Sequence, residues 1–255
     1  MTTDYSLGNG SFSGLQDTMP NIGSAVSTAS TPLPASLPSG MVAWWPADGY
    51  PTDIVGFNST TLGDATYSAS EVGQAFTFNG AENVDVANSA GLNPTAAITV
   101  DAWVYANSLG TASVMVKKSD GANGYSLEML NGQFAFYVYI PTTEQSWHAA
   151  SSTAPSTNRW YHVAGTYDGT QVSIYVNGKL EGSTAVTGAI GASSNDLNIG
   201  SDPSNLQDTG RYWNGMIDEV EIFNRALSAT EIQAIYSAGT AGKDKSQAQP
   251  PVIGF

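Results

Sequence analysis

One carboxylate in the stretch WNGMIDEVEIF, residues 213–223, stands where a strand would place an apolar side chain. Alternate residues of a β-strand point to opposite faces, so Met216, Val220 and Ile222 share one face and Asp218 lies among them. An ionised carboxylate on a core face costs several kcal/mol unless it is paired, hydrogen-bonded or bound to a cation. Asp218 is therefore either a carboxylate hydrogen-bonded to the backbone at the edge of a sheet or a metal ligand.

The loop DGYPTDIVGFN, residues 48–58, offers the oxygen atoms that a calcium ion needs. Calcium takes about six to eight oxygens from carboxylates, amide carbonyls and the backbone. Asp48, Asp53 and Asn58 supply side-chain oxygens, and Gly56 helps the loop to turn its carbonyls inward. The spacing fails the EF-hand pattern, so the loop alone does not establish a calcium site.

Aromatic and aliphatic side chains alternate in three segments, ITVDAWVY, QFAFYVYI and QVSIYV. Where the aliphatic faces form a core, the rings fall on outer faces, and flat rings there suit stacking on sugars. The alternative is that the rings pack under loops or form cross-strand pairs that support the sheet. The candidate sugar-binding residues are Trp103, Tyr105, Tyr137, Tyr139 and Tyr175.

Composition limits the classes of function. The chain of 255 residues has 22 acidic and 8 basic side chains, a formal net charge of −14. Such a surface repels phosphate backbones, so we expect no nucleic-acid binding, whereas it suits divalent cations. Cysteine is absent, which excludes disulfides, thiolate metal sites and thiol nucleophiles. No apolar run approaches about 18 residues, so we expect no insertion into a membrane.

Short segments rich in Val, Ile, Tyr, Phe and Trp, separated by turn signals, predict an all-β fold. They are MVAWW, GQAFTF, AITVDAWVYA, SVMVKK, GYSLEML, QFAFYVYI, RWYHVAGTY, QVSIYV, DLNIG and GMIDEVEIF. Their spacing favours an antiparallel two-sheet sandwich or jelly roll. One short helix follows in LSATEIQAIYSAG, with a capping box of Ser228 and Glu231 and a stop at Gly239.

Two tails flank this region. Residues 1–40 are rich in Ser, Thr, Gly, Pro and Ala and form a low-complexity arm without a core of its own. Residues 241–255 read as a second tail with an apolar tip. We therefore expect an arm over 1–40, a jelly-roll domain over 41–240 and a C-terminal tail.

Four stretches in this order resemble the laminin-G-like, concanavalin A-like lectin/glucanase jelly-roll family: QAFTFNGAENVDV, ITVDAWVYANS, RWYHVAGTYDGTQVSIYVNGKLEG and NGMIDEVEIFNRALSATEIQAIY. With WWPADGYPTDIVGFN near the start, the resemblance covers residues 42–239. It implies two antiparallel sheets, one of them concave, and ligands held at the concave face or the rim. Function varies widely across this fold and has to be argued from the site.

The resemblance also implies a structural calcium ion, which many members of the family bind. On residue-by-residue transfer its ligands are Asp53 and Asp218, with a carbonyl oxygen from Asn58, while Asp48 orders the loop. The ion would tie the first strand to the last in a domain without disulfides.

Some relatives with this fold are glycosidases or lyases. Hydrolysis of a glycosidic bond generally needs two carboxylates flanking it, and the E-x-D-x-x-E pattern of laminarinase-type enzymes does not occur in this sequence. Glu219 and Glu221 share a strand face, where we expect them to be solvated. His162 lies in RWYHVAGTY, which the family carries as scaffold. We therefore expect no enzymatic activity.

The sequence predicts a non-catalytic recognition or adhesion module that binds carbohydrate or a cell-surface glycan. Protein contacts of residues 1–40 would join it to a larger assembly at a virion surface, outside a cell or on its surface. Two alternatives remain open. One is a structural decoration or fibre protein of a virion without sugar binding, and the other is an accessory module of a secreted glycosidase.

Overall fold

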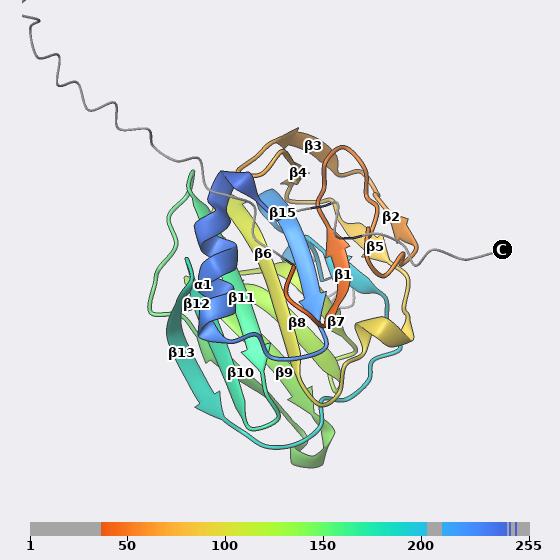
Figure 1. Ribbon diagram of the computed structural model, residues 1–255, viewed down its shortest axis with the longest axis vertical. Coiled ribbons are helices and arrows are strands. Elements are labelled where there is room, and N and C mark those ends of the chain that lie inside the picture. The colour runs from red at the N-terminus through yellow and green to blue at the C-terminus, as the bar shows by residue number, and fades with distance from the viewer. Residues whose placement is uncertain (1–36, 203–210, 244, 246–247, 249–255) are drawn as a thin grey trace, which may run out of the picture. The chain divides into compact units, whose positions relative to one another are not determined.

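The computed structural model describes residues 37–202, 211–243, 245 and 248 (Figure 1). These residues belong to one folded unit, Pro32–Phe255. The arm over residues 1–40 lies almost wholly outside the described residues, as does most of the tail over 241–255. Its role in assembly stays a prediction.

The described strands form two antiparallel sheets, as the turn spacing predicts. The eight-stranded sheet has the order β13-β12-β11-β6-β15-β4-β3, with β1 paired to β15, and the seven-stranded sheet has the order β10-β9-β8-β7-β14-β5-β2. The first consists of β1 (Met41–Trp45), β3 (Thr66–Ala69), β4 (Gln74–Asn79), β6 (Ile98–Ala106), β11 (Trp160–Tyr167), β12 (Gln171–Val176), β13 (Lys179–Ala185) and β15 (Asn214–Phe223). The second consists of β2 (Thr60–Thr61), β5 (Val84–Val86), β7 (Ala112–Ser119), β8 (Gly124–Leu130), β9 (Gln133–Ile140), β10 (Gln145–Ala150) and β14 (Leu197–Ile199). Short 3-10 turns occupy Ala90–Leu92, Pro141–Thr143 and Gly239–Ala241.

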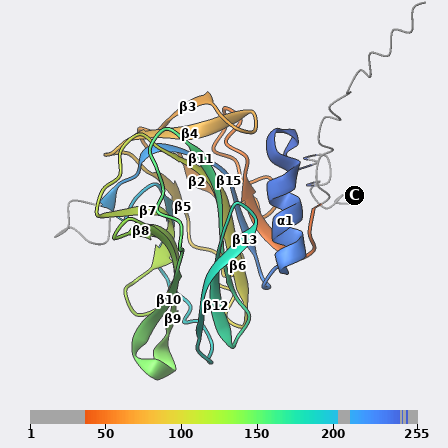
Figure 2. The same cartoon turned by 90° about the vertical axis from the view of Figure 1, so that its left-hand side faces the viewer.

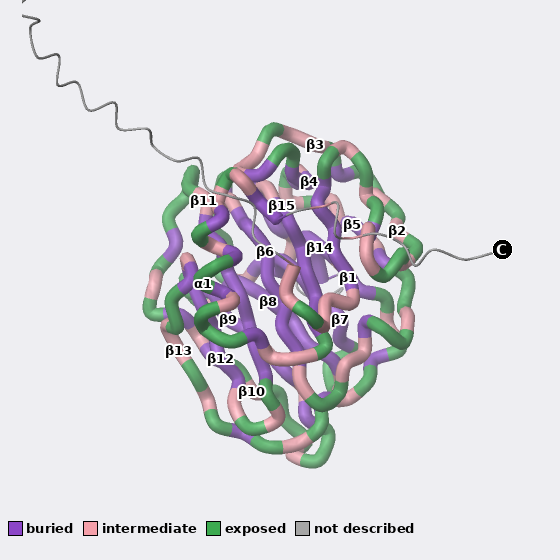
Figure 3. The backbone as a smooth tube through the Cα atoms, viewed as in Figure 1, coloured by how far each residue is buried: buried purple, intermediate pink, exposed green. Residues whose placement is uncertain are grey.

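The core lies between the two sheets, and it contains the aliphatic faces that the alternation predicts for β6, β9 and β12. The sheets approach closely at Gly165 of β11, where an added Cβ would come 2.0 Å from the ring of Phe136 in β9. Figure 3 shows that β6, β8 and β15 are buried along most of their length. These strands are buried on both faces, so other parts of the chain must cover the faces that point away from the core.

Helix α1 (Ala229–Ala238) packs against the outer face of the eight-stranded sheet (Figure 2). Ser228 and Glu231 form the predicted capping box, and Gly239 is the C-cap. Ile232 and Ile235 of the helix join Tyr175 in a small apolar cluster outside the main core. Among the described residues no helix is long and apolar enough to cross a membrane.

Strand β15 departs from the strict alternation expected for WNGMIDEVEIF. Its register with β6 shifts between Asp218 and Glu221, and Glu219 has φ +51°, in the left-handed region. The bulge places Ile217, Val220 and Ile222 in the core and turns Asp218 to the outer face, opposite Trp103. The expectation that Asp218 shares a face with Val220 and Ile222 is therefore wrong, because one extra residue shifts the alternation.

Candidate functional site

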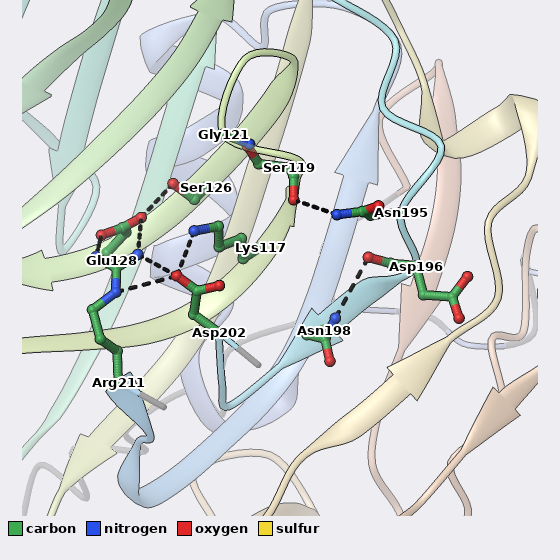
Figure 4. Close-up of polar contacts among 10 residues, drawn as sticks. All are labelled: Lys117, Ser119, Gly121, Ser126, Glu128, Asn195, Asp196, Asn198, Asp202 and Arg211. Atoms are coloured by element: carbon green, nitrogen blue, oxygen red, sulfur yellow. Dashed lines mark hydrogen bonds and ion pairs between the residues drawn. The ribbon is translucent and has the colours of Figure 1, made fainter. Parts of the chain in front are cut away.

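The outer face of the seven-stranded sheet carries a connected set of polar side chains (Figure 4). Lys117 of β7 lies opposite Ser126 of β8 in register, and Glu128 is the next residue on the same face of β8. Asp202 follows β14 and Arg211 precedes β15, so two loop residues complete the set. We call these five residues, Lys117, Ser126, Glu128, Asp202 and Arg211, the paired network.

Each charge in the paired network is neutralised by another. The Lys117 Nζ atom lies 2.5 Å from Asp202 Oδ2. Arg211 donates from Nη2 to the same oxygen at 2.6 Å and from Nη1 to Glu128 Oε2 at 2.8 Å. The Ser126 hydroxyl donates to Glu128 Oε1 at 2.6 Å. Glu128 and Asp202 are only 2% and 1% exposed, so these bonds hold both carboxylates in fixed positions.

Arg211 keeps its charge in this setting. Burial alone lowers the pKa of the guanidinium, but Glu128 and Asp202 raise it above its ordinary value. Its backbone has φ +39°, in the left-handed region. Backbone strain of this kind persists where the surrounding structure holds the residue, and four hydrogen bonds to Glu128 and Asp202 hold Arg211.

Two pockets lie on either side of the turn between β7 and β8. The first, about 310 Å³, we call the Asp196 pocket; it is lined by Asp85, Lys117, Ser119, Asn195, Asp196, Asn198 and Asp202. The second, about 370 Å³, we call the Tyr139 pocket; it is lined by Gly121, Ala122, Asn123, Tyr139, Pro141, Glu144, Gln145 and Ser146. Ser119 of the first pocket accepts at its hydroxyl oxygen from the backbone N–H of Gly121 of the second at 3.0 Å, so the two pockets adjoin.

Tyr137 and Tyr139 lie on this outer face, as the alternation in β9 predicts. Both are partly buried, and the ring of Tyr137 stacks on His148 of β10, with centroids 4.6 Å apart and an interplanar angle of 26°. Burial, reinforced by Glu128, raises the pKa of Tyr137 to about 12, so its hydroxyl stays a neutral donor near neutral pH. The face therefore combines flat rings with fixed polar groups.

Trp103, Tyr105 and Tyr175 lie on the other sheet, and the structure does not bring them to the face of Tyr137 and Tyr139. Trp103 stacks on Tyr236 of helix α1 at 5.8 Å and is 6% exposed. Tyr175, 8% exposed, packs in the apolar cluster under the same helix. The expectation that Trp103 and Tyr175 offer open rings is wrong, because helix α1 covers them.

Tyr105 differs from these two because it is only partly buried. It packs against Trp160 with centroids 5.5 Å apart, which is the cross-strand support that was the alternative interpretation.

The outer face of the eight-stranded sheet holds buried acids. Asp101, Glu219 and Glu221 are each at most 1% exposed, so the expectation that Glu219 and Glu221 are solvated is wrong. Lys243 contacts Glu221 and lies 3.9 Å from Glu219, and Lys245 lies 3.1 Å from Glu219. We call Lys243 and Lys245 the lysine clamp. These two residues, which follow helix α1, supply the positive charge that neutralises the acids.

The groups around the lysine clamp titrate far from their ordinary values. Burial raises the pKa of Asp101 to about 7, against the attraction of Lys243. Burial and Lys243 lower the pKa of His162 to about 3, so its ring is neutral. Among the described residues both ring nitrogens of His162 lack a hydrogen-bond partner, and Nε2 lies 4.0 Å from Asp101 Oδ1. His162 is therefore a buried, neutral residue on the outer face of the eight-stranded sheet.

The residues proposed to hold calcium do not fit a shared ion site. Five N–H groups surround the Asp53 carboxylate: the backbone amides of Trp44, Val55, Gly56 and Asn58 and the side-chain amide of Asn58. These donors fill the lone pairs that a cation would use. The Asn58 carbonyl oxygen accepts from the Ser89 hydroxyl at 2.5 Å.

Asp218 has a different set of partners. Its carboxylate accepts from the Ser70 hydroxyl and from the backbone N–H of Glu219, both at 2.7 Å. Among the described residues, no group of three or more His, Cys, Asp or Glu side chains could hold a metal ion. Asp48 accepts from the backbone N–H of Gln74 and pairs with Lys245, so its partners lie outside the loop 48–58, whereas Asp53 bonds the amides within that loop. Chelation tests the calcium hypothesis directly.

Comparison with known proteins identifies the superfamily to which this chain belongs. A laminin-G-type family model of the concanavalin A-like lectin/glucanases superfamily matches residues 78–233. The chain belongs to this superfamily. A curated relative, the human adhesion G-protein coupled receptor D1, is 33% identical over 127 residues, which is 48% of this chain and 14% of the receptor. The chain therefore matches only a small part of that relative's length.

Solved structures share the superfamily fold at low identity. Domain 4 of the arabinanase AbnA from Geobacillus stearothermophilus, in complex with arabinotriose, has a TM-score of 0.62 and 20% identity, covering 76% of this chain and 96% of that chain. The ligand binding domain of botulinum neurotoxin serotype D, in complex with N-acetylneuraminic acid, has a TM-score of 0.61 and 18% identity, covering 77% and 50%. The binding domain of paraclostridial mosquitocidal protein 1 has a TM-score of 0.64 and 13% identity, covering 77% and 52%. At these identities the likeness shows the fold alone.

Proposed function

We propose that the protein is a non-catalytic recognition module that binds carbohydrate on the outer face of the seven-stranded sheet. The observation that carries this proposal is the pair of adjoining pockets beside the paired network. A ligand site is typically a concave surface with a few fixed polar groups, and two adjoining pockets suit a chain of sugar rings.

The chemistry of the face supports a sugar ligand. Sugar rings present apolar C–H faces, which pack on aromatic rings, and hydroxyl groups, which hydrogen-bond carboxylates and amides. Tyr139 supplies a ring in one pocket, and Asn195, Asn198 and Asp196 supply polar groups in the other. Domains of similar fold were solved with arabinotriose and with N-acetylneuraminic acid, which is in keeping with this proposal.

The carboxylates of the paired network favour binding over hydrolysis. A glycosidase needs two carboxyl groups that face the scissile bond, one as acid and one as base or nucleophile. Glu128 and Asp202 are both held by Arg211, and Asp202 also by Lys117, so their oxygens are engaged within the protein. The proposal therefore assigns them a structural role beneath the ligand.

The proposal also concerns where the protein acts. A glycan-binding domain acts where it can reach displayed glycans. It would therefore lie outside a cell, on a cell surface or on the surface of a particle that binds to cells. We keep the assembly contact in residues 1–40 as part of this proposal, since a module joined to a larger body gains from repeated weak binding.

A glycan array followed by calorimetry with the best ligand tests the proposal. Tyr139→Ala removes the ring of one pocket and is expected to weaken binding up to about tenfold. Phe57→Ala is the matched control, because Phe57 is 53% exposed in the loop after β1 and lines neither pocket. Retention of no glycan, or equal losses in the two variants, would contradict the proposal.

A further inference from the structure

We infer that the Asp196 pocket selects sugars by charge, preferring amine-bearing glycans to neutral ones and rejecting acidic ones. This inference rests on the proposed function and names the ligand class of that site. It follows from which charges around the pocket are already paired and which are open.

The positive charges next to the pocket are committed to the protein. The Lys117 ammonium faces Asp202 at 2.5 Å, and Arg211 is shared between Asp202 and Glu128. Lys117 lines the pocket, but Asp202 already offsets its charge, so a sugar carboxylate would compete with Asp202 for this ammonium. Such an exchange leaves a buried charge without its partner, which is strongly unfavourable.

Lys118, the next residue along β7, is also committed. Its Nζ atom donates to Asn88 Oδ1 at 2.7 Å, to the Ser193 carbonyl at 3.1 Å and to the Asn195 carbonyl at 2.6 Å. An ammonium group has three N–H donors, so these three acceptors use all of them. No donor remains on Lys118 for an anionic ligand.

Two carboxylates in the pocket are open instead. Asp196 is exposed and Asp85 is partly exposed, and both line the pocket. The Asp196 carboxylate accepts from the backbone N–H of Asn88 at 2.8 Å, and its charge acts on Lys118, whose pKa it raises. Within the described residues, no ion pair joins either carboxylate to a cation. An ammonium group in the pocket would meet two acceptors of opposite charge, while a sugar carboxylate would meet like charges.

The charge of the whole chain acts in the same direction. A formal net charge of −14 attracts cationic ligands and repels anionic ones at long range. Salt screens this long-range part, whereas contacts inside a pocket are screened less. Selectivity that survives added salt therefore reports the pocket itself.

The test uses oligosaccharides of matched length that differ in charge. Calorimetry with the full chain compares a chitosan oligomer with free amines, its N-acetylated chitin counterpart and an oligogalacturonate, at low and at physiological salt. We expect the chitosan oligomer to bind about tenfold or more tightly than the chitin oligomer, and the oligogalacturonate to bind most weakly. Asp85→Asn with Asp196→Asn should bring the three affinities together.

A matched control separates local from overall charge. Asp64→Asn with Glu71→Gln removes the same net charge at positions outside both pockets and should leave the order of affinities unchanged. Binding of the uncharged and acidic oligomers with equal affinity, or an order that the Asp85 and Asp196 changes leave intact, would overturn the charge selection while the sugar-binding proposal stands. Failure of these three oligosaccharides to bind while the array retains other glycans would overturn the charge selection alone, and retention of no glycan at all would overturn both.

Discussion

The two outer faces of this sandwich bury charged residues by different means. On the seven-stranded sheet, acids and bases come from neighbouring strands and loops, and two pockets lie beside the paired network. On the eight-stranded sheet, the strands contribute the acids Asp101, Glu219 and Glu221, and helix α1 and the lysine clamp cover them. The difference shows that a strand's own pattern does not decide whether an outer face is open; the segments that return across it do.

Among these tests, removal of Lys243 should change the stability of the protein most. Lys243→Met leaves the buried carboxylates of Glu219 and Glu221 without their main counter-charge, and we expect the free energy of unfolding to fall by about 3–5 kcal/mol. Urea denaturation followed by tryptophan fluorescence measures this. Lys179→Met, at an exposed lysine of β13, is the control and should change stability by less than about 0.5 kcal/mol.

The corresponding test on the outer face of the seven-stranded sheet removes Lys117. Lys117→Met should cost only about 1–2 kcal/mol, because Arg211 still neutralises Asp202. Equal losses for Lys117→Met and Lys243→Met would show that the two faces rely on their lysines to the same degree, and the comparison would fail.

The covered face should also respond to pH through Asp101. Its pKa is about 7 in the folded protein and 3.8 ordinarily, so between these values unfolding releases a proton. The stability that Asp101 contributes is therefore greatest below about pH 4 and is lost as pH rises through about 7. The difference in unfolding free energy between the native protein and Asp101→Asn should shift by about 1–3 kcal/mol over this range. A difference that stays constant with pH would mean that Asp101 titrates normally.

Chelation should have the smallest effect. Because N–H groups surround Asp53 and Lys245 approaches Glu219 beside Asp218, we expect EDTA to leave the melting temperature unchanged. Elemental analysis of the purified protein is the independent check. A stoichiometric calcium content, with a melting temperature that falls in EDTA and recovers with added calcium, would restore the calcium hypothesis.

The fold was accessible from the sequence because its signals are local. Alternation in QFAFYVYI assigns Phe136 to the core and Tyr137 to the outer face, and Ser228 with Glu231 marks the start of the helix. Each signal lies within one element and depends on backbone geometry that neighbouring residues share. The resemblance to the superfamily then orders the elements.

The site was less accessible because its contacts join distant residues. Glu128 meets Arg211, and Glu221 meets Lys243, only once strand register and the path of the chain after β15 are known. The bulge at Glu219 also reversed the face of Asp218, and a non-glycine residue with positive φ leaves no local signature there. One signal was available: Glu128 stands alone among the apolar residues of GYSLEML, which marks a charge in need of a partner.

The positions of the two ends of the described chain have a consequence for how the domain would be presented. Leu37 leads into β1, and Lys245 and Ala248 lie beside the loop after β1, so both ends of the described chain meet the eight-stranded sheet. That sheet is on the side of helix α1, away from the outer face of the seven-stranded sheet (Figure 2). A support joined at either end would leave the pocketed face directed outward. Copies on a common support could then engage neighbouring glycans at once, and weak single contacts would combine into avidity.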